Sequence, residues 1–130
     1  MYSATTNSIR VIVEPLFLAD QSSPDDNIFV WAYNVRIENN SKIAVQLKSR
    51  IWKITDNLGQ SQKIKGRGVV GQQPTLDPGD AFEYTSGVPL KSPSAIVQGS
   101  YKMLTEYDEW IDVSIPAFSL DSPFFNNTRH

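Results

Sequence analysis

The sequence predicts an all-β fold, an immunoglobulin-like or fibronectin type III-like sandwich of two antiparallel sheets with about seven strands. Three observations support this. Apolar residues alternate with polar ones, turn residues recur every 8 to 12 residues, and no segment keeps apolar residues at helical spacing over ten residues. The 130 residues suit a single domain, with its core over residues 5–120 and a C-terminal tail over residues 121–130.

The first half of the chain contains three long strand patterns. The clearest covers residues 28–38, in which every second residue is apolar or aromatic. Residues 9–18 form another strand, and Pro15 places its far end at a sheet edge or a bulge because proline donates no ladder hydrogen bond. In residues 43–55 the apolar positions change phase around residues 49–51, so one inserted residue, a β-bulge, is expected there.

The second half contains shorter strands separated by turns. The Asp56–Gly59 turn predicts a hairpin with the strand that follows it. Pro78 and Gly79 mark another turn, and Pro89 and Pro93 are expected to bracket a loop. The remaining strands are expected over residues 60–65, 81–85, 95–104 and 111–115, with Phe118 and Leu120 closing the core.

The types of residue present exclude several common kinds of catalytic site. The chain has no cysteine, which excludes thiolate nucleophiles and Cys-based zinc sites, and its single histidine, His130, belongs to the expected tail. No cofactor is indicated, and the protein is not expected to be an enzyme. Direct binding of a divalent cation stays open against the alternative of solvated turns. Its candidate carboxylates are Asp77, Asp80, Glu106, Asp108, Glu109 and Asp112.

The apolar runs and the net charge of the sequence predict where the protein is located and which kinds of partner it binds. The sequence shows no signal peptide and no apolar run of the roughly 20 residues that cross a bilayer, so we expect a cytoplasmic protein without membrane insertion. The net charge of −2 argues against general nucleic-acid affinity. We expect an unidentified protein partner and, because sheet edges can pair, a possible homodimer.

The positive charges are unevenly distributed. Residues 42–67 hold seven cations and one acid, a net +6, while the rest of the chain holds 5 cations and 13 acids, a net −8. Alternation places Lys48 and Arg50 on one face of their strand, and Lys63, Lys65 and Arg67 on one face of the next. If the strands pair, the two rows could form one positive patch. This patch is either a docking surface for an acidic partner or phosphate, or an edge charged against aggregation.

The segment GRGVVG, residues 66–71, matches the G-x-G-x-x-G spacing of dinucleotide-binding turns. The context argues against that function, because valines follow the glycines and Pro74 blocks a phosphate-binding helix. The glycines are better explained by positive φ, a bulge or close backbone approach. One alternative stays open, in which Gly66, Gly68 and Gly71 free backbone amides for an anion beside Arg67.

Six segments stand in a characteristic order: RIWKITD (50–56), GRGVVGQQP (66–74), LDPG (76–79), FEYTSG (82–87), GSYKM (99–103) and VSIPAFSL (113–120). Together they resemble the ApaG family, over essentially residues 5–120. The resemblance implies a fibronectin type III-like sandwich and a poorly understood function. Bacterial members are linked genetically to cobalt resistance and magnesium efflux, and eukaryotic relatives occur as domains of F-box and DNA-polymerase-interacting proteins. The family has no established catalytic residues, and its glycine motif has been likened to a pyrophosphate-binding loop.

Three functions follow as hypotheses. The first is a non-enzymatic binding module that acts through protein contacts. The second is a phosphate or nucleotide binder at the glycine loop, residues 66–71. The third is a direct binder of Mg²⁺ or Co²⁺.

Overall fold

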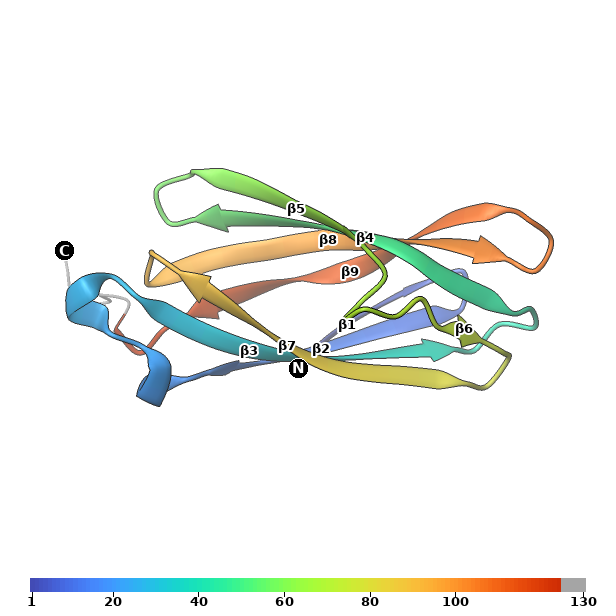
Figure 1. The fold of residues 1–130 in the computed structure, drawn as a ribbon, viewed down its shortest axis with the longest axis horizontal. Helices are drawn as coiled ribbons and strands as arrows, with labels where there is room; N and C mark the ends of the chain where they lie inside the picture. The colour runs from blue at the N-terminus through green and yellow to red at the C-terminus, as the bar shows by residue number, and fades with distance from the viewer. Residues whose placement is uncertain (125–130) are drawn as a thin grey trace.

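The computed structural model describes residues 1–124, which form nine strands in two antiparallel sheets packed face to face (Figure 1). Phe125 and His130, which the sequence assigns to the tail, lie outside the described residues. No helix in residues 1–124 has the length and apolarity needed to cross a membrane. The strands are β1 (Tyr2–Thr6), β2 (Ile9–Phe17), β3 (Phe29–Asn39), β4 (Val45–Asp56), β5 (Ser61–Arg67), β6 (Thr75–Leu76), β7 (Ala81–Leu90), β8 (Ser94–Thr105) and β9 (Trp110–Asp121), and 3-10 turns occur at Ala19–Gln21 and Pro24–Asp26.

The first sheet has the strand order β1-β2-β3-β7. The period-two pattern of residues 28–38 is confirmed as β3, which buries Phe29, Trp31, Val35 and Ile37. Pro15 of β2 lies opposite β3, on a stretch of β2 that extends beyond the end of β1. The expected edge position of Pro15 is therefore confirmed.

The second sheet has the order β5-β4-β8-β9, and the short strand β6 also pairs with β4. Leu47 pairs with Met103, but Ser49 pairs with the adjacent Lys102, so Lys48 is the inserted residue of a β-bulge. The predicted bulge is confirmed, one residue before the expected range. The hairpin of β4 and β5 is also confirmed.

The structure differs from the expected strands in four places. Two strands, β1 and β6, were not anticipated. The loop expected at Pro89 is instead part of β7, which tolerates a proline because it is an edge strand. Strand β9 continues through Pro116 to Asp121, and a register shift between Val97 and Gly99 of β8 absorbs the change of phase before Phe118.

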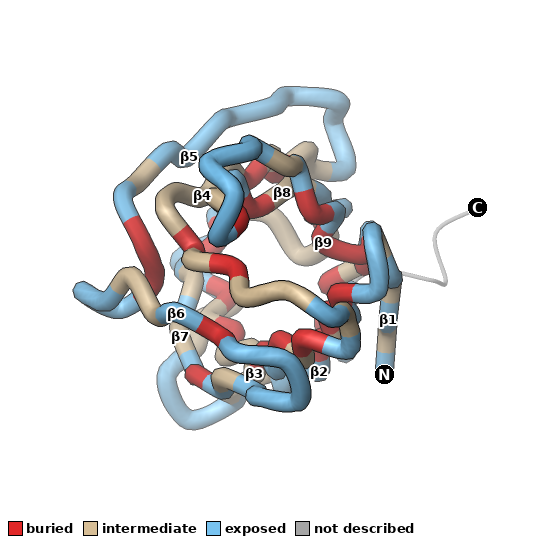
Figure 2. The backbone as a smooth tube through the Cα atoms, turned by 90° about the vertical axis from the view of Figure 1, so that its right-hand side faces the viewer, coloured by how far each residue is buried: buried red, intermediate tan, exposed pale blue. Residues whose placement is uncertain are grey.

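The hydrophobic core lies between the sheets, as the end-on view in Figure 2 shows. Each strand presents alternate residues to it, which is why the apolar pattern has a period of two. Asn39 is a buried polar residue whose side-chain amide donates to the carbonyls of Ile43 and Leu76, both at 2.9 Å. The fully buried large side chains are Ile9, Val11, Val13, Val35, Ile37, Val45, Leu47, Val69, Tyr101, Met103, Val113 and Leu120.

Candidate functional site

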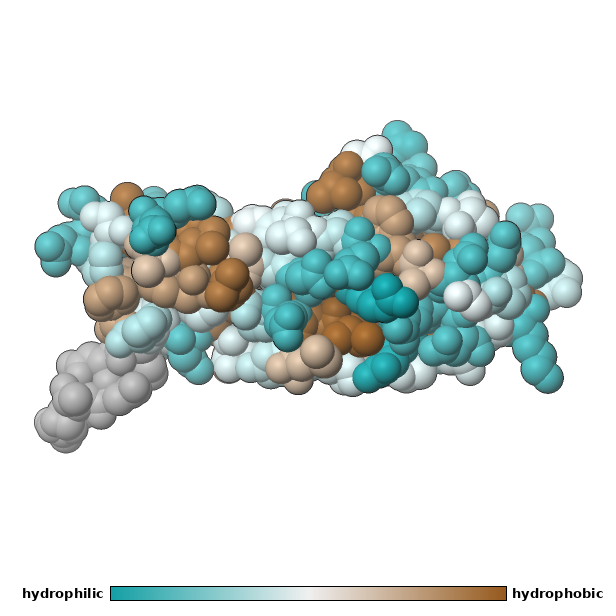
Figure 3. Space-filling view, turned by 90° about the horizontal axis from the view of Figure 1, so that it is seen from below, coloured by the Kyte–Doolittle hydropathy of each residue, from teal (hydrophilic) through white to brown (hydrophobic). Residues whose placement is uncertain are grey.

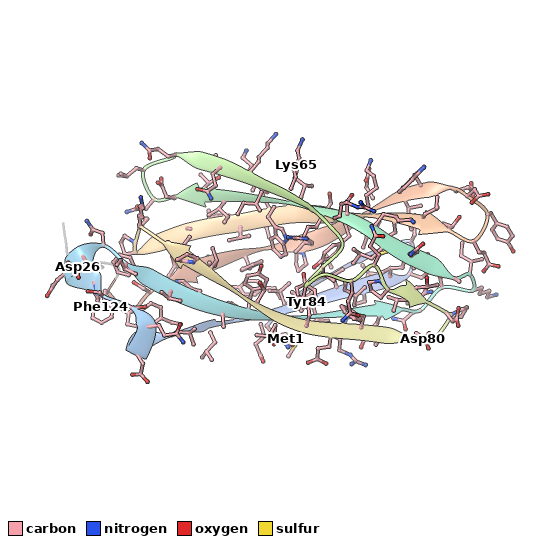
Figure 4. The ribbon with its side chains drawn as sticks, in the orientation of Figure 1. Met1, Asp26, Lys65, Asp80, Tyr84 and Phe124 are labelled. Carbon is pink, nitrogen blue, oxygen red and sulfur yellow. The ribbon has the colours of Figure 1, made fainter. Side chains whose placement is uncertain are left out.

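The outer surface of β5, β4 and β8 carries a cluster of cations that we call the cationic face: Lys53, Lys63, Lys65, Arg67 and Lys102. Pairing of β4 with β5 places Lys63 opposite Lys53, Lys65 opposite Ile51, and Arg67 opposite Ser49. Ser49 in turn pairs with Lys102 of β8. Because directly opposed residues share a sheet face, these side chains project from the same side. Figure 4 shows Lys65 pointing away from the sandwich.

Most of this charge has no acidic partner in the described chain. Lys102 lies 3.6 Å from Asp112. None of the other four cations forms an ion pair within residues 1–124. A surface groove of about 480 Å³ crosses the face between Lys65, Arg67, Ser100 and Lys102. The face therefore offers unpaired positive charge around a shallow depression.

The opposite outer surface, on β2, β3 and β7, contrasts with this one. There Arg36 donates to Glu38 at 2.9 Å and lies 3.4 Å from Glu83, and Arg10 lies 3.7 Å from Glu38. The hydrogen bond from Arg36 lowers the pKa of Glu38 and raises the pKa of Arg36. This side, seen in Figure 3, is mainly hydrophilic with separate apolar areas. Arg10 and Arg36 are each paired with a glutamate there.

The structure separates two of the predicted patch residues from the others. Arg50 lies opposite Gly66, on the face of β4 that points toward the β1-β2-β3-β7 sheet, so the two rows do not share one sheet face. Arg50 still borders the groove beside Lys65 and Arg67, because Gly66 has no side chain to cover it. Lys48 occupies the bulge, and its carbonyl accepts hydrogen bonds from the Gly68 amide and the Gln73 side chain, at 2.9 and 2.8 Å. Simple alternation misplaced Arg50, because the bulge at Lys48, one residue before the expected range, reverses the face of every later residue in β4.

The glycine loop, residues 66–71, connects β5 to the segment that leads into β6. Val69 and Gln72 exchange two backbone hydrogen bonds of 2.8 Å. The two residues between them, Val70 and Gly71, have φ of +43° and +80°. This is the pattern of a type I′ turn. The segment thus turns back tightly, with strand pairing before it and the short strand β6, not a helix, following it.

Two of the glycines lie close to neighbouring groups, but only at Gly68 is that neighbour rigid backbone. A Cβ on Gly68 would lie 2.0 Å from the Gln72 carbonyl oxygen, and a Cβ on Gly66 would lie 2.7 Å from the guanidinium of Arg50. Two loop amides, those of Gly68 and Val69, already donate to backbone carbonyls, as does the amide of the adjacent Gln72. The candidate anion site at Gly66, Arg67, Gly68 and Gly71 therefore has fewer free amides than the spacing suggested.

Arg50 connects this loop to the interior. Its Nη1 donates to the Gly68 carbonyl at 2.5 Å and to the Arg67 carbonyl at 3.3 Å. It lines a cleft of about 250 Å³ between the sheets, together with Tyr33, Trp52 and Tyr84. The guanidinium thus lies between a polar loop and an aromatic cleft.

Two tyrosines form a buried hydrogen bond beside the cleft that Arg50 lines. The hydroxyl groups of Tyr84 and Tyr101 are paired, across the two sheets. Burial raises the pKa of both well above the ordinary tyrosine value, and the nearby Arg50 offsets only a small part of that effect. Both hydroxyls are therefore neutral at physiological pH. No motif in the sequence singled out Tyr84 or Tyr101 as functional residues.

The candidate carboxylates are dispersed. Glu106 accepts a hydrogen bond from the Ala44 amide, Asp80 accepts one from the Asp77 amide, and Asp112 lies beside Lys102. Within residues 1–124, no group of three or more His, Cys, Asp or Glu side chains could hold a metal ion.

Comparison with known proteins identifies the family. The ApaG domain profile matches residues 19–105, which is more than half of the chain. The chain belongs to the ApaG family.

Similarity to individual members extends over nearly the full length. The chain is 59% identical over 123 residues to Protein ApaG of Paramagnetospirillum magneticum, covering 95% of each sequence. It is 54% identical over all 130 residues to Protein ApaG of Parvibaculum lavamentivorans. The crystal structure of the putative ApaA protein from Bordetella pertussis is 41% identical with a TM-score of 0.86, covering 92% of this chain and 98% of that one. The resemblance and the sandwich fold expected from the sequence are both confirmed.

Proposed function

We propose that this protein is a non-catalytic binding module whose cationic face docks an acidic segment of a partner protein. The observation that carries the proposal is the row Lys63, Lys65 and Arg67 beside Lys53, with no acidic partner within residues 1–124. In the other sheet, by contrast, arginines and glutamates neutralise one another. A charged surface of this kind steers an oppositely charged partner and fixes its register.

The position of the charges on the sheet also supports docking. Strand β5 is an edge strand, so an extended acidic segment could lie along it or across the neighbouring groove. Protection of an edge against aggregation explains charges on β5 itself. It does not explain Lys53 and Lys102, which lie on inner strands of the sheet. Any role in magnesium efflux or cobalt resistance, which the family resemblance implies, would then act through the bound partner.

The proposal is tested with charge reversals and a defined peptide. Binding of a fluorescent Glu-rich peptide is measured by anisotropy for the unmodified protein, for Lys63→Glu/Lys65→Glu, and for Lys42→Glu/Lys91→Glu. The last variant changes the net charge equally at exposed lysines outside the cationic face. We expect the first variant to lose binding and the second to keep most of it, and we expect salt to weaken binding.

Two results would contradict the proposal. One is equal binding of a Gln-rich peptide, which has the same shape without the charge. The other is an equal loss in both reversal variants, since this would reflect net charge and not a defined face. A crosslinking experiment in native cells with the same variants then identifies the partner, whose crosslinks should depend on Lys63 and Lys65.

Phosphate binding at the glycine loop is a second candidate. The amides of Val70 and Gly71 donate to no backbone carbonyl within residues 1–124, and Arg67 precedes them in the loop. Successive amides next to a cation can hold an anion. Calorimetry with pyrophosphate and nucleoside triphosphates should then show heat that Arg67→Ala reduces. Absence of heat at millimolar ligand would exclude this candidate.

A further inference from the structure

The sandwich is closed along one side and open along the other. Strand β9 packs against β1 and β2 on the closed side. On the other side the edge strands β5 and β7 remain, and the cleft of about 250 Å³ lies between them. Ile64, Val70 and Gly87, all at its margin, are exposed to solvent. A ligand can therefore reach the cleft without displacing a strand of either sheet.

Aromatic rings form the wall of the cleft. The ring centroids of Tyr33 and Trp52 are 5.3 Å apart, and those of Trp52 and Phe118 are 6.0 Å apart. Tyr84 contributes a further ring, and Figure 4 shows it between the two sheets. Edge-to-face and tilted clusters of this kind favour a flat apolar guest. The wall is thus suited to a ring rather than to a strongly hydrated group.

The polar end of the cleft is Arg50. Both of its hydrogen bonds within the described chain come from Nη1, so Nε and Nη2 remain available. These two groups form the edge of the guanidinium that binds a carboxylate with two parallel hydrogen bonds. Among the described residues, no Asp or Glu lines the cleft. The positive charge of Arg50 is consequently not neutralised from within the cleft.

We propose that this cleft binds a small carboxylate that carries an aromatic ring, with the carboxylate on the Nε–Nη2 edge of Arg50 and the ring against Trp52 and Tyr33. The volume supports a one-ring ligand, because pockets for drug-sized molecules have about 300–1,000 Å³. Charge supports an anion, and the apolar walls support a ring. The ring-binding wall of this site lies on the inner side of β4, whereas Arg50 also borders the groove of the cationic face.

The test uses phenylacetate and two related probes. Binding is followed by chemical-shift changes of the backbone amides and of the indole groups, which report on Trp52 directly. Phenylacetate should give saturable shifts at residues of the cleft in the millimolar range or tighter. Phenylacetamide, which keeps the ring but lacks the charge, and acetate, which lacks the ring, should each bind at least about tenfold more weakly.

Matched variants localise the site. Arg50→Gln should weaken phenylacetate binding at least about tenfold, whereas Arg67→Gln, on the cationic face, should leave it unchanged. If Arg50→Gln does not fold, Val88→Phe tests the same site, because a larger side chain at the cleft wall should block the ring while Arg50 remains. The proposal is overturned if shifts do not saturate, if phenylacetamide binds as well as phenylacetate, or if Arg67→Gln alone weakens binding.

Discussion

Arg50 of β4 donates from Nη1 to the carbonyl of Gly68 at 2.5 Å, and this hydrogen bond ties the glycine loop to the inner face of the sheet. The same guanidinium lies against Gly66, where a Cβ would force the arginine to shift. The spacing of this motif suggests nucleotide binding, but in the structure the loop binds the Arg50 side chain. The Gly68 carbonyl accepts its hydrogen bond, and Gly66 leaves room for the guanidinium. Its remaining glycines shape the turn that follows.

Arg50→Ala should lower the free energy of unfolding by about 1.5–3 kcal/mol, the usual contribution of hydrogen bonds to a charged group. The reason is that the Arg50 side chain donates hydrogen bonds to the backbone carbonyls of both Arg67 and Gly68, and the variant loses both. Urea unfolding measures the change. The matched control is Arg67→Ala, whose exposed side chain projects from the other face and should change stability by less than about 0.5 kcal/mol. Equal losses in the two variants would contradict the role given to Arg50.

Gly68→Ala should be clearly more destabilising than Gly71→Ala, although both glycines have positive φ. Alanine at positive φ costs roughly 1–2 kcal/mol in either variant. At Gly68 the new Cβ also meets the Gln72 carbonyl, whereas nothing lies within 4 Å at Gly71. Overpacking should add about 1–3 kcal/mol at Gly68 alone. Thermal unfolding of the two variants under identical conditions checks the difference, and equal melting temperatures would show that the contact is absent.

Val70→Asn should stabilise the protein by about 1 kcal/mol. A β-branched residue with φ of +43° is strained, and asparagine tolerates this region far better. Val70 is also 53% exposed, so little buried contact is lost. Ile96→Asn is the control, since Ile96 is 54% exposed in a regular strand and should show no gain. A loss of stability at Val70 would mean that its side chain makes contacts worth more than the strain.

Tyr84→Phe should lower stability by about 1–3 kcal/mol, because the Tyr101 hydroxyl is then buried without its partner. The double variant Tyr84→Phe/Tyr101→Phe should lose less than the sum of the two single variants. Removing both hydroxyls leaves neither one unsatisfied. A double-mutant cycle from urea unfolding gives the coupling, and strict additivity would argue against the hydrogen bond.

Stability should fall as the pH rises above about 10, the ordinary pKa of tyrosine. Burial raises the pKa of Tyr84 and Tyr101 in the folded state. Above the ordinary value the unfolded chain loses these protons while the folded chain retains them, so the unfolded state is favoured as pH increases. Each tyrosine contributes a slope of up to about 1.4 kcal/mol per pH unit. In the variant Tyr84→Phe/Tyr101→Phe, the free energy of unfolding should decline less steeply with pH above about 10. An unchanged slope would contradict burial of these tyrosines as the cause.

Much of the architecture could be predicted from the sequence because each strand has one buried face, which gives an apolar pattern with a period of two. The alternation in residues 28–38 specified β3, and the phase change after Leu47 specified the bulge. Strand β1 was missed since its residues, from Tyr2 to Thr6, alternate only weakly in polarity. Strand β6 has two residues, too few for any periodicity.

The candidate site was only partly accessible. Charge counting found Lys63, Lys65 and Arg67 and placed them on one strand face, which the pairing of β5 bears out. It could not add Lys102, which is distant in sequence and reaches the cationic face through its register with Ser49. It also could not locate the cleft, since that depends on which sheet edges lie opposite each other.

The sequence by itself determined the all-β class, the bulge and hairpin of the second sheet, the family, and the local concentration of positive charge. These depend on patterns between near neighbours along the chain. Only the tertiary structure decided that Arg50 faces inward while Lys65 faces outward. The physical reason is that a single inserted residue, Lys48, reverses the orientation of the strand after it, and the partner strands fix where that reversal occurs.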